Sequence, residues 1–469
     1  MKAWLTFFGI LVVSFCDAQQ SMTLDQCIQT AWQNNLQMKQ AELSVESGEA
    51  NLKAAQTNIL PNLNGFATHN YNWGQRIDPF TNQFATSRVQ SNSFGVSSSV
   101  DLFNGFQNQQ NIKVREAALE SVQFDLETQK NNIALNVAAA FLAVVMTEEL
   151  IGVSDQQVVI TKQQLDRVIK LVEAGSLNAG ARYDLEAQLA RDEAQRVQRQ
   201  NDYQMAMLQL KQMLILPADE SISLEKPSNL DLESKETLEN AATVYAFAES
   251  NMPEIKSAQM SLLQWDSQMK SAQSGRYPSL SLSGSIGTGY SGLRSRIVSV
   301  TPNGADEIGY TSANDIVYIP SYETQVERVP FGTQLGDNFN QFIGLSLNVP
   351  VFNRGSVSNS VKQAKINRSL AELQLEQEKI GLRQKIESAR VDAIAAKETY
   401  RSNQASLSAA AKAFEFAKAR FEAGALNATE FNTSKGNLEL ANNAVTRSKY
   451  DYIFKSKILD FYLGKSLGF

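Results

Sequence analysis

Two halves of this chain carry the same short motifs in the same order, and this internal repeat limits the choice of folds more than any other feature of the sequence. The segment Leu171–Asn178 reads LVEAGSLN and Arg420–Asn427 reads RFEAGALN, an offset of 249 residues. Leu102–Asn104 and Val351–Asn353 both end in Phe-Asn and keep the same offset. A chain of 469 residues is therefore expected to use one kind of unit twice instead of three unrelated domains.

The upstream parts of the two halves match at a different offset. Leu60–Leu63 (LPNL) corresponds to Tyr277–Leu280 (YPSL), and the difference in residue number is smaller here than for the motifs above. The second half therefore contains 32 more residues than the first between its proline and its Phe-Asn motif. We place this insertion in the polar stretch 293–338, which contains Pro and Gly and is expected to form a long loop.

Each half also contains a long stretch of helical character. Residues 105–172 contain no proline and one internal glycine, Gly152, so they are expected to form one helix of roughly 100 Å. Glycines at 175 and 424 end these helices, and second helices follow to about 216 and 463. Each half thus predicts a long helical hairpin with glycine at its tip. Apolar residues recur every seven positions, as in a coiled coil, at Ile151, Val158, Leu165 and Val172, and again at Tyr400, Leu407, Phe414 and Phe421.

Four stretches alternate between apolar and small polar residues, which is typical of strands. They are 63–73, 93–102, 280–290 and 339–351, and each is about as long as a strand of a membrane-spanning barrel. An ordinary half-buried antiparallel sheet alternates in the same way. The expected apolar face collects Leu63, Ala67, Phe94, Val96, Val100, Leu102, Leu280, Leu282, Ile286, Ile343, Leu345, Leu347, Val349 and Val351.

The second face and the strand ends favour a barrel. Small Ser, Gly and Asn residues suit a water-filled lumen, and Tyr71, Trp73 and Tyr290 suit an aromatic girdle at a membrane interface. Four strands cannot close a barrel, and lipid does not tolerate an open edge, so the chain is expected to oligomerise, with about twelve strands in a trimer. The longest apolar run past the N-terminus, Ala138–Val145, is too short for a transmembrane helix.

The N-terminus predicts export. An apolar run from Trp4 to Phe15 precedes small residues, so residues 1–18 are expected to be a secretory signal peptide. Cys16 leaves lipidation open as an alternative to ordinary cleavage. After cleavage only Cys27 remains, which excludes an internal disulfide and a cysteine-based metal site. The formal net charge of −6 gives no indication of nucleic-acid binding.

The duplicated helical hairpins, the two strand pairs and the glycine tips resemble the TolC family of outer-membrane channels. The resemblance covers nearly the whole chain, from Thr23–Gln26 onward and again from Thr237–Asn240. It implies an α+β membrane protein, mostly α, whose long coiled-coil helical hairpins form a periplasmic α-barrel and whose four strands contribute to a trimeric outer-membrane β-barrel. It also implies a homotrimer in outer-membrane lipid of a Gram-negative-type bacterium, which docks a periplasmic adaptor (membrane-fusion) protein and an inner-membrane transporter.

Within this interpretation each half supplies a periplasmic helix, a transmembrane hairpin and a long helical hairpin. The expected segments are a signal peptide (1–18), the first periplasmic helix (19–62), β-hairpin (63–103) and helical hairpin (104–216), a linker (217–236), the second periplasmic helix (237–278), a β-hairpin with an extracellular loop at about 293–338 (279–352), and the second helical hairpin (353–469).

The resemblance also implies two functional regions. Six tip residues match the turns by which family members contact their adaptor, although plain hairpin turns would look the same: Gly175, Ser176, Leu177, Gly424, Ala425 and Leu426. Glu430 stands where family members place an acid that rings the closed periplasmic mouth, and Asp184 is the acid that follows the first tip. Three like carboxylates around a narrow pore would favour cations. A solvated helix face is the alternative for Glu430.

The sequence departs from the best-known gate of that family. Thr433 stands where a second acid often lies, Leu426 stands where a basic partner can lie, and the first tip is expected to be about two residues longer than the second. Because of these departures, the sequence alone does not identify the residues of the resting gate.

The sequence offers no set of residues for catalysis. His69 is the only histidine and has no Cys, Asp or Glu at ligand spacing, so no catalytic, cofactor-binding or metal site is expected and the chain is not expected to be an enzyme. A periplasmic coiled-coil adaptor or scaffold would share the heptads but would lack the four strands. Within the duct interpretation small-molecule efflux is favoured, while type I protein secretion and metal-ion efflux stay open.

Overall fold

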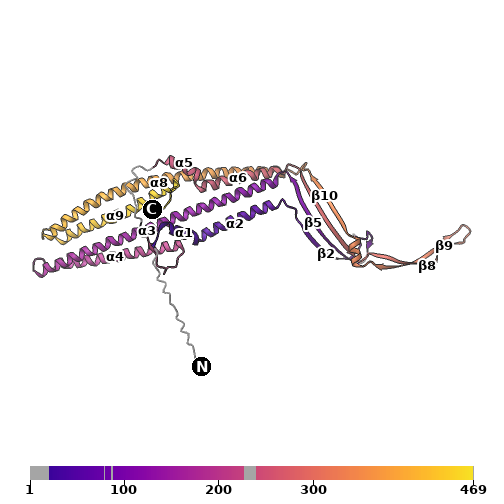
Figure 1. Ribbon diagram of the computed structural model, residues 1–469, viewed down its shortest axis with the longest axis horizontal. Coiled ribbons are helices and arrows are strands. Elements are labelled where there is room, and N and C mark those ends of the chain that lie inside the picture. Colours follow the sequence, from indigo (N-terminus) through magenta and orange to yellow (C-terminus); the bar gives the residue numbers. More distant parts are fainter. Residues whose placement is uncertain (1–20, 79, 86–87, 227–238, 468–469) are drawn as a thin grey trace, which may run out of the picture. The chain divides into compact units, whose positions relative to one another are not determined.

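The computed structural model describes residues 21–78, 80–85, 88–226 and 239–467, so the expected signal peptide, Cys16 and much of the linker lie outside the described residues. Figure 1 shows long paired helices and a sheet of long strands. The first repeat consists of α1 (Leu24–Asn34), α2 (Leu36–Thr57), β2 (Asn64–Asn72), β5 (Val89–Asn104), α3 (Gln107–Glu173) and α4 (Ala179–Leu214). The second consists of α5 (Ala241–Asn251), α6 (Pro253–Ser274), β7 (Ser279–Ser291), β10 (Asn340–Asn348), α8 (Ser356–Glu422) and α9 (Ala428–Tyr462).

The observed elements repeat with the two offsets found in the sequence. Helices α1 and α2 return as α5 and α6 at the offset of the two proline motifs, and α3 returns as α8 at the offset of the two glycine tips. Both α3 and α8 contain 67 residues. Each repeat begins with an N-cap residue. Thr23 forms a capping box with Gln26 at the start of α1, and the Asn240 side chain accepts from the N–H of Ala242 at the start of α5.

Contacts divide the chain into two compact units. One contains the described parts of 1–49, 117–263 and 369–469, and the other contains 50–116 and 264–368. The first unit is helical and has two apolar cores. The larger core joins α1, α2, α3, α4 and α9 around Cys27, Met38, Phe141 and Leu210, while the smaller one joins α5, α6 and α8 around Val244, Ile255 and Ile386. A short parallel pair, β1 (Ser21–Met22) and β6 (Ser223–Leu224), lies beside the larger core.

Helix α3 corrects one expectation from the sequence. It is long and apolar enough to cross a membrane by length and composition, although no stretch past the N-terminus was expected to be. Half of its apolar window is buried inside the protein, where Val137, Phe141 and Val145 pack in the larger core. Such burial is typical of a core helix. The high hydropathy of α3 therefore reflects packing inside the protein, which composition alone does not reveal.

The heptad seam of α3 also differs from the expectation. Val158 is buried, but Ile151, Leu165 and Val172 are only half-buried. The fully buried heptad positions are instead occupied mainly by polar residues, namely Ser154, Gln157, Thr161 and Gln164, with Val168. In the second repeat, Phe414 and Phe421 of α8 pack against the buried ring of Phe431, with centroids 5.6 and 4.7 Å apart.

The second unit contains a four-stranded sheet of order β10-β7-β5-β2, in which every neighbouring pair is antiparallel. The register is regular except for one bulge in β5 between Asp101 and Phe103. This bulge puts Phe103 opposite Leu280, where continued alternation would have put Leu102. Phe103 therefore joins the apolar face at the position expected for Leu102, and Leu102 is the extra residue of the bulge.

The insertion of the second repeat is folded, although it was expected to be a loop. Residues 293–338 contain β8 (Ser295–Tyr310), β9 (Ile316–Arg328) and α7 (Phe331–Asp337). Strands β8 and β9 pair with each other and with no other described strand. In the same place between its long strands, the described part of the first repeat contains the short pair β3 (Arg76–Ile77) and β4 (Phe84–Ala85). Figure 1 shows the β8–β9 hairpin extending beyond the ends of the long strands.

Candidate channel wall and helical tips

The two faces of the four-stranded sheet differ sharply in chemistry. Residues directly opposite each other on neighbouring strands share a face, so the register assigns every side chain. One rung, for example, aligns Gly65, Val96, Ile286 and Gln341. The face that contains this rung is apolar over most of its length and collects Ala67, Phe94, Val96, Val100, Leu280, Leu282, Ile286, Ile343, Leu345 and Leu347.

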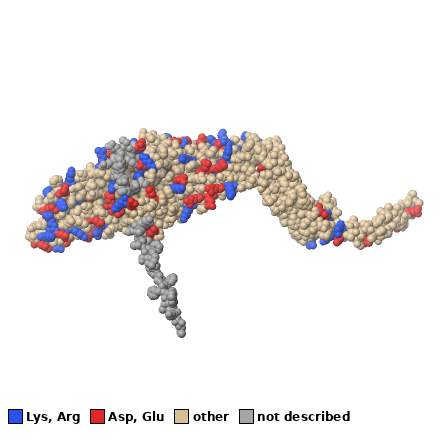
Figure 2. All heavy atoms as spheres, in the orientation of Figure 1, with Lys and Arg blue, Asp and Glu red and all other residues tan. Residues whose placement is uncertain are grey.

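The opposite face is built mainly from Ser, Gly, Thr and Asn, and its exceptions include Phe66, Phe342 and the carboxylate Asp101. Its rungs include Ser97 with Ser285, and Gly95 with Gly287. The ring of Phe66 covers Gly95 closely, because a Cβ at residue 95 would lie 2.7 Å from that ring. The four strands contain Asp101 as their single carboxylate and neither Lys nor Arg. Figure 2 shows the same contrast, with few charged atoms over the sheet and many over the helices. The sheet has the composition of a wall between lipid and water.

The three residues of the expected aromatic girdle lie at one end of this sheet. Tyr290 of β7 stands opposite Asn92, which in turn stands opposite His69 of β2. Tyr71 is one rung further on and packs against Trp73, with ring centroids 6.2 Å apart. The Tyr290 ring lies 5.3 Å from Phe331 of α7. The structure thus brings the three residues to the same strand ends, and a role at a membrane interface stays a proposal.

A buried hydrogen-bond cluster holds these strand ends together. The Ser291 hydroxyl donates to Asp78 Oδ2 (2.6 Å), and the Gln334 side chain bonds both the N–H and the C=O of Ser291 (2.9 and 3.0 Å). All three residues are fully buried. Burial by itself would raise the pKa of Asp78, but hydrogen bonds from Ser291, Thr81 and Phe80 outweigh it and lower that pKa below its ordinary value.

No sequence pattern pointed to this cluster, because 213 residues separate Asp78 from Ser291. A signal did exist in the short loop that follows Asp78. Its carboxylate accepts from the N–H groups of Phe80 and Thr81, which is the local turn that an Asp favours. The partners on β7 and α7 could be found only from the fold.

The helical tips of the first unit share one backbone geometry. Gly175 and Gly424 have φ values of +69° and +73°, the left-handed conformation that glycine adopts without strain. The N–H of Ser176 donates to the C=O of Leu171 (2.8 Å), and the N–H of Ala425 donates to that of Arg420 (2.8 Å). These bonds, together with those of the two glycines, complete a Schellman motif at each helix end.

The two tips also have the same length, so the expectation of a longer first tip is wrong. Asn178 caps α4 and Asn427 caps α9, each by accepting from the N–H three residues ahead, and the two caps stand at equivalent places of the repeat. Leu177 and Leu426 are half-buried, while the other four expected tip residues are exposed. Near the tips, Arg167 of α3 bonds the Glu422 side chain and backbone C=O of α8 at 3.3 and 3.0 Å.

The two expected gate acids occupy different positions relative to these caps. Glu430 is the third residue of α9, and its Oε1 accepts from the Asn427 side-chain amide (3.2 Å) while its own N–H donates to Asn427 Oδ1 (2.8 Å). Ala181 takes the equivalent place after the first tip, and Asp184 lies one turn further along α4. Both acids are exposed. Glu430 thus has a local capping role, and its part in a ring of carboxylates stays a proposal.

A buried ion pair that the sequence did not indicate joins the two helical hairpins. The Lys435 ammonium of α9 donates to the Asp192 carboxylate of α4 and to the Thr161 hydroxyl of α3, and Thr161 donates to Asp192. Side-chain exposure is only 2% for Lys435 and 5% for Asp192. Gln188 donates to the second carboxylate oxygen of Asp192 (2.7 Å). The pair is therefore desolvated but well supplied with hydrogen bonds.

One further acid lies beside this pair. Burial raises the pKa of Glu439 above its ordinary value, and the negative charge of Asp192 raises it further, while Lys435 and Arg199 act in the opposite direction. Lys435, Asp192 and Glu439 thus place three ionisable groups close together among α3, α4 and α9.

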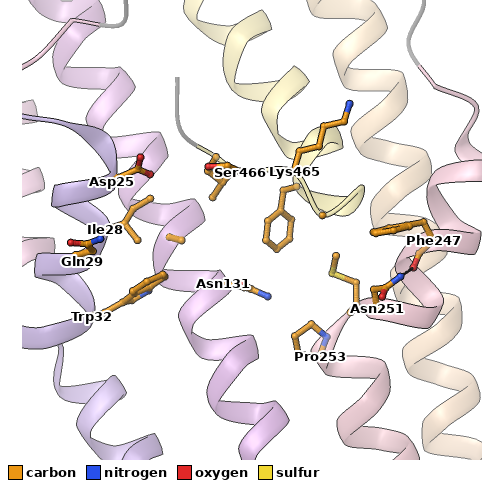
Figure 3. A pocket seen from close by; sticks show the side chains of 15 residues that line it. Asp25, Ile28, Gln29, Trp32, Asn131, Phe247, Asn251, Pro253, Lys465 and Ser466 are labelled. Atoms are coloured by element: carbon orange, nitrogen blue, oxygen red, sulfur yellow. Dashed lines mark hydrogen bonds between the residues drawn. The ribbon is translucent and has the colours of Figure 1, made fainter.

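An open hollow of about 620 Å³ lies where the short helices of the two repeats meet the C-terminal segment (Figure 3). Its walls include Trp32 of α1, Asn131 of α3, Phe247 and Asn251 of α5, and residues 464–467. Asp25 and Lys465 are the charged residues of this lining. Among the described residues, no group of three or more His, Cys, Asp and Glu is placed to hold a metal ion.

The chain is similar to known outer-membrane proteins along nearly its full length. The family model described as outer membrane efflux protein matches residues 27–214 and 244–465. Outer membrane protein TolC of Escherichia coli (strain K12) is 22% identical over 475 residues, which cover 97% of this chain and 85% of the relative. A solved structure of VceC from Vibrio cholerae has a TM-score of 0.73 at 15% identity and covers 95% of this chain and 96% of its own. A solved structure of CusC has a TM-score of 0.75 at 15% identity, with coverage of 95% and 93%.

Proposed function

The chain belongs to the outer membrane efflux protein family, and from this premise we propose that it is one subunit of a homotrimeric exit duct for small molecules. It is an outer-membrane channel protein with the mostly helical fold of that family. In the proposed duct, three copies form one barrel across the outer membrane, and the helices form a passage that a periplasmic adaptor and an inner-membrane transporter open.

The observation that carries this proposal is a sheet with one apolar face, one small polar face and two free edges. Strands β10 and β2 each have an unpaired edge among the described strands. In lipid such edges must be paired, because unsatisfied backbone groups cost several kcal/mol each in hydrocarbon. Other copies of the chain can supply the missing partners.

Strand direction supports closure by identical copies. Four strands that alternate in direction leave β2 and β10 antiparallel to each other, so β10 of one copy can pair with β2 of the next in the same antiparallel manner. Three copies give twelve strands, within the range of roughly 8 to 26 of bacterial barrels. The apolar face would then meet lipid, and the Ser, Gly and Asn face would line a lumen wide enough for water.

We expect the mature chain, purified from outer membranes in detergent, to have the mass of a trimer and to give small, flickering conductance in planar bilayers. The small conductance would reflect a resting mouth that is closed at the helical end. Mass in detergent and single-channel recording measure the two properties separately. A water-soluble monomer without conductance would contradict the duct, and a coiled-coil scaffold would then explain the helices.

The tips are proposed to dock the adaptor. Ser176 and Ala425 are exposed at equivalent places of two tips with the same backbone geometry, so one recognition motif is presented twice by each copy. We expect Ser176→Arg combined with Ala425→Arg to raise accumulation of a fluorescent dye in intact cells to the level of a deletion strain.

The matched control for these variants is Ser408→Arg, an equally large change at an exposed position of α8. The control is expected to leave dye accumulation unchanged. Both variants should keep the oligomer mass and conductance of the parent. If the tip variant exports dye normally, the tips are plain hairpin turns.

Glu430 is proposed to contribute to a ring of carboxylates at the closed mouth. Glu430→Gln removes its charge but keeps an oxygen that can accept from Asn427, so the cap of α9 is retained. We expect the variant to lose much of the cation preference of the resting channel, because three carboxylates near a narrow pore attract cations. Reversal potentials in asymmetric KCl measure this preference. Unchanged selectivity would leave Glu430 with its capping role alone.

A further inference from the structure

The β8–β9 hairpin has one largely apolar face that no described residue covers, with Glu307 as its single charged residue between positions 297 and 326. All three of its register shifts add a residue to β8, while β9 runs without interruption, so alternate residues of β9 stay on one face. Tyr310, Tyr322 and Val326 on this face are 66%, 58% and 64% exposed. The face combines Ile316, Tyr318, Pro320, Tyr322, Thr324 and Val326 with their partners Tyr310, Glu307, Ala305, Pro302, Val300 and Ile297.

The opposite face of the hairpin is more polar. Arg296 pairs with Glu327 at 3.4 Å, and Ser299 lies opposite Gln325 at 3.3 Å. Thr301 lies opposite Glu323, and only near the turn do Val317 and Ile319 interrupt this polar face. The hairpin is therefore amphipathic along most of its length, and its apolar face needs a partner because two strands alone are marginally stable in water.

The partner must approach the face and not the edges. Pro302 in β8 and Pro320 in β9 have no N–H to offer to an added strand. The three bulges in β8 interrupt its edge further. Addition of a foreign strand to either edge is thus hindered, while the apolar face stays accessible.

The base of the hairpin is fixed to the sheet. The N–H of Val329 donates to the C=O of Arg294 (3.0 Å), and Arg294 donates to Asp337 at the end of α7 and to Asn338 just beyond it (3.1 and 2.7 Å). The Asn338 amide in turn donates to the C=O of Gly289 in β7 (2.7 Å). The chain leaves β7 at Ser291 and returns in β10, which carries one free edge of the sheet. The hairpin therefore starts beside the strand that the next copy would join.

From this placement we propose that the apolar face of the β8–β9 hairpin packs against the same hairpin of the other copies and forms a collar beyond the barrel. The inference rests on the proposed trimer, which places three equivalent hairpins around one axis. Turned toward that axis, the three apolar faces bury one another and leave the polar faces in water. Lipid cannot cover this face along its length, because the hairpin begins past the aromatic strand ends and extends away from them (Figure 1).

Cysteine cross-linking in outer membranes tests the collar. Tyr318→Cys and Tyr322→Cys place a thiol on the apolar face, and Glu323→Cys and Gln325→Cys are matched controls on the polar face of the same strand. Burial raises the pKa of Cys27 to about 12, so this native thiol stays unreactive, and the unsubstituted chain serves as the blank. The reagent is a short bifunctional maleimide, and denaturing gels separate the products.

We expect the Tyr318→Cys and Tyr322→Cys chains to migrate largely as cross-linked dimers, because one reactive thiol per chain allows one link between two of the three copies. The two control variants should stay monomeric on the gel. Equal cross-linking on both faces, or none on the apolar face, would overturn the collar. Apolar-face thiols that do not cross-link but resist a water-soluble maleimide would also overturn it, since another partner would then cover them. Mass in detergent separates the two proposals: a trimer without cross-links rejects the collar alone, whereas a monomer rejects the duct as well.

Discussion

Replacement of Lys435 by Met is expected to weaken the packing of the two helical hairpins by about 3–5 kcal/mol, since it leaves the Asp192 carboxylate buried without its cation. The Thr161 hydroxyl and the Gln188 amide would still donate to Asp192, but neither carries a charge. The protein should respond by local opening of α4 and α9, because that lets water reach the carboxylate. Amide hydrogen exchange of the two helices should then be faster by a factor on the order of 100 or more.

Two comparisons make this expectation specific to the buried charge. Lys449→Met removes an ion pair with Glu149 that is 25% and 38% exposed, and its effect should be at most about 1 kcal/mol. Lys435→Met combined with Asp192→Leu removes both charges and should recover most of the lost protection. Equal exchange rates in the Lys435→Met and Lys449→Met proteins would show that the buried pair does not hold the hairpins together.

The helices and their tips could be predicted from the sequence because local chemistry fixes them. Gly175 and Gly424 are followed after three residues by Asn178 and Asn427, and this spacing places a left-handed residue and an N-cap around each turn. The offset between the two tips then identified two long helices of equal length, α3 and α8. The expectation of a longer first tip failed because Asn178 and Asn427 each stand three residues past their glycine and set tips of equal length.

The faces of the sheet were also accessible, because alternation depends only on the period of a strand. The bulge in β5 was not, since an extra residue leaves no signal in composition and moved Phe103 to the place expected for Leu102. The inserted segment was expected to be a loop for the same reason. The three bulges of β8 shift the apolar residues from one parity to the other, which hides a regular amphipathic hairpin in the sequence.

The buried pair of Lys435 and Asp192 was beyond prediction for a different reason. The two residues are 243 positions apart, and charged residues on a helix are usually solvated. Buried polar residues at heptad positions of α3, such as Thr161 and Gln164, likewise break the rule that a seam is apolar. Only the packing of three helices brings Thr161, Asp192 and Lys435 together.

Replacement of Ile286 by Arg is expected to destabilise the assembled wall by about 2–4 kcal/mol, the cost of a cation on the lipid face near the middle of a membrane. Ile286 lies in the interior of β7 on the apolar face, opposite Val96 on one side and Gln341 on the other. The side chain cannot escape into the lumen, because the register fixes its face. The fraction of oligomer that resists SDS at room temperature in outer-membrane extracts measures the effect.

Ser285→Arg is the matched control, since it places the same side chain one residue away on the opposite face. There the guanidinium would stand in the proposed water-filled lumen, so assembly should be nearly unchanged while the channel loses cation preference. Equal loss of oligomer from both variants would mean that neither face meets water. Equal tolerance would mean that neither face meets lipid. The membrane assignment therefore depends on the difference in SDS-resistant oligomer between substitutions at two adjacent residues.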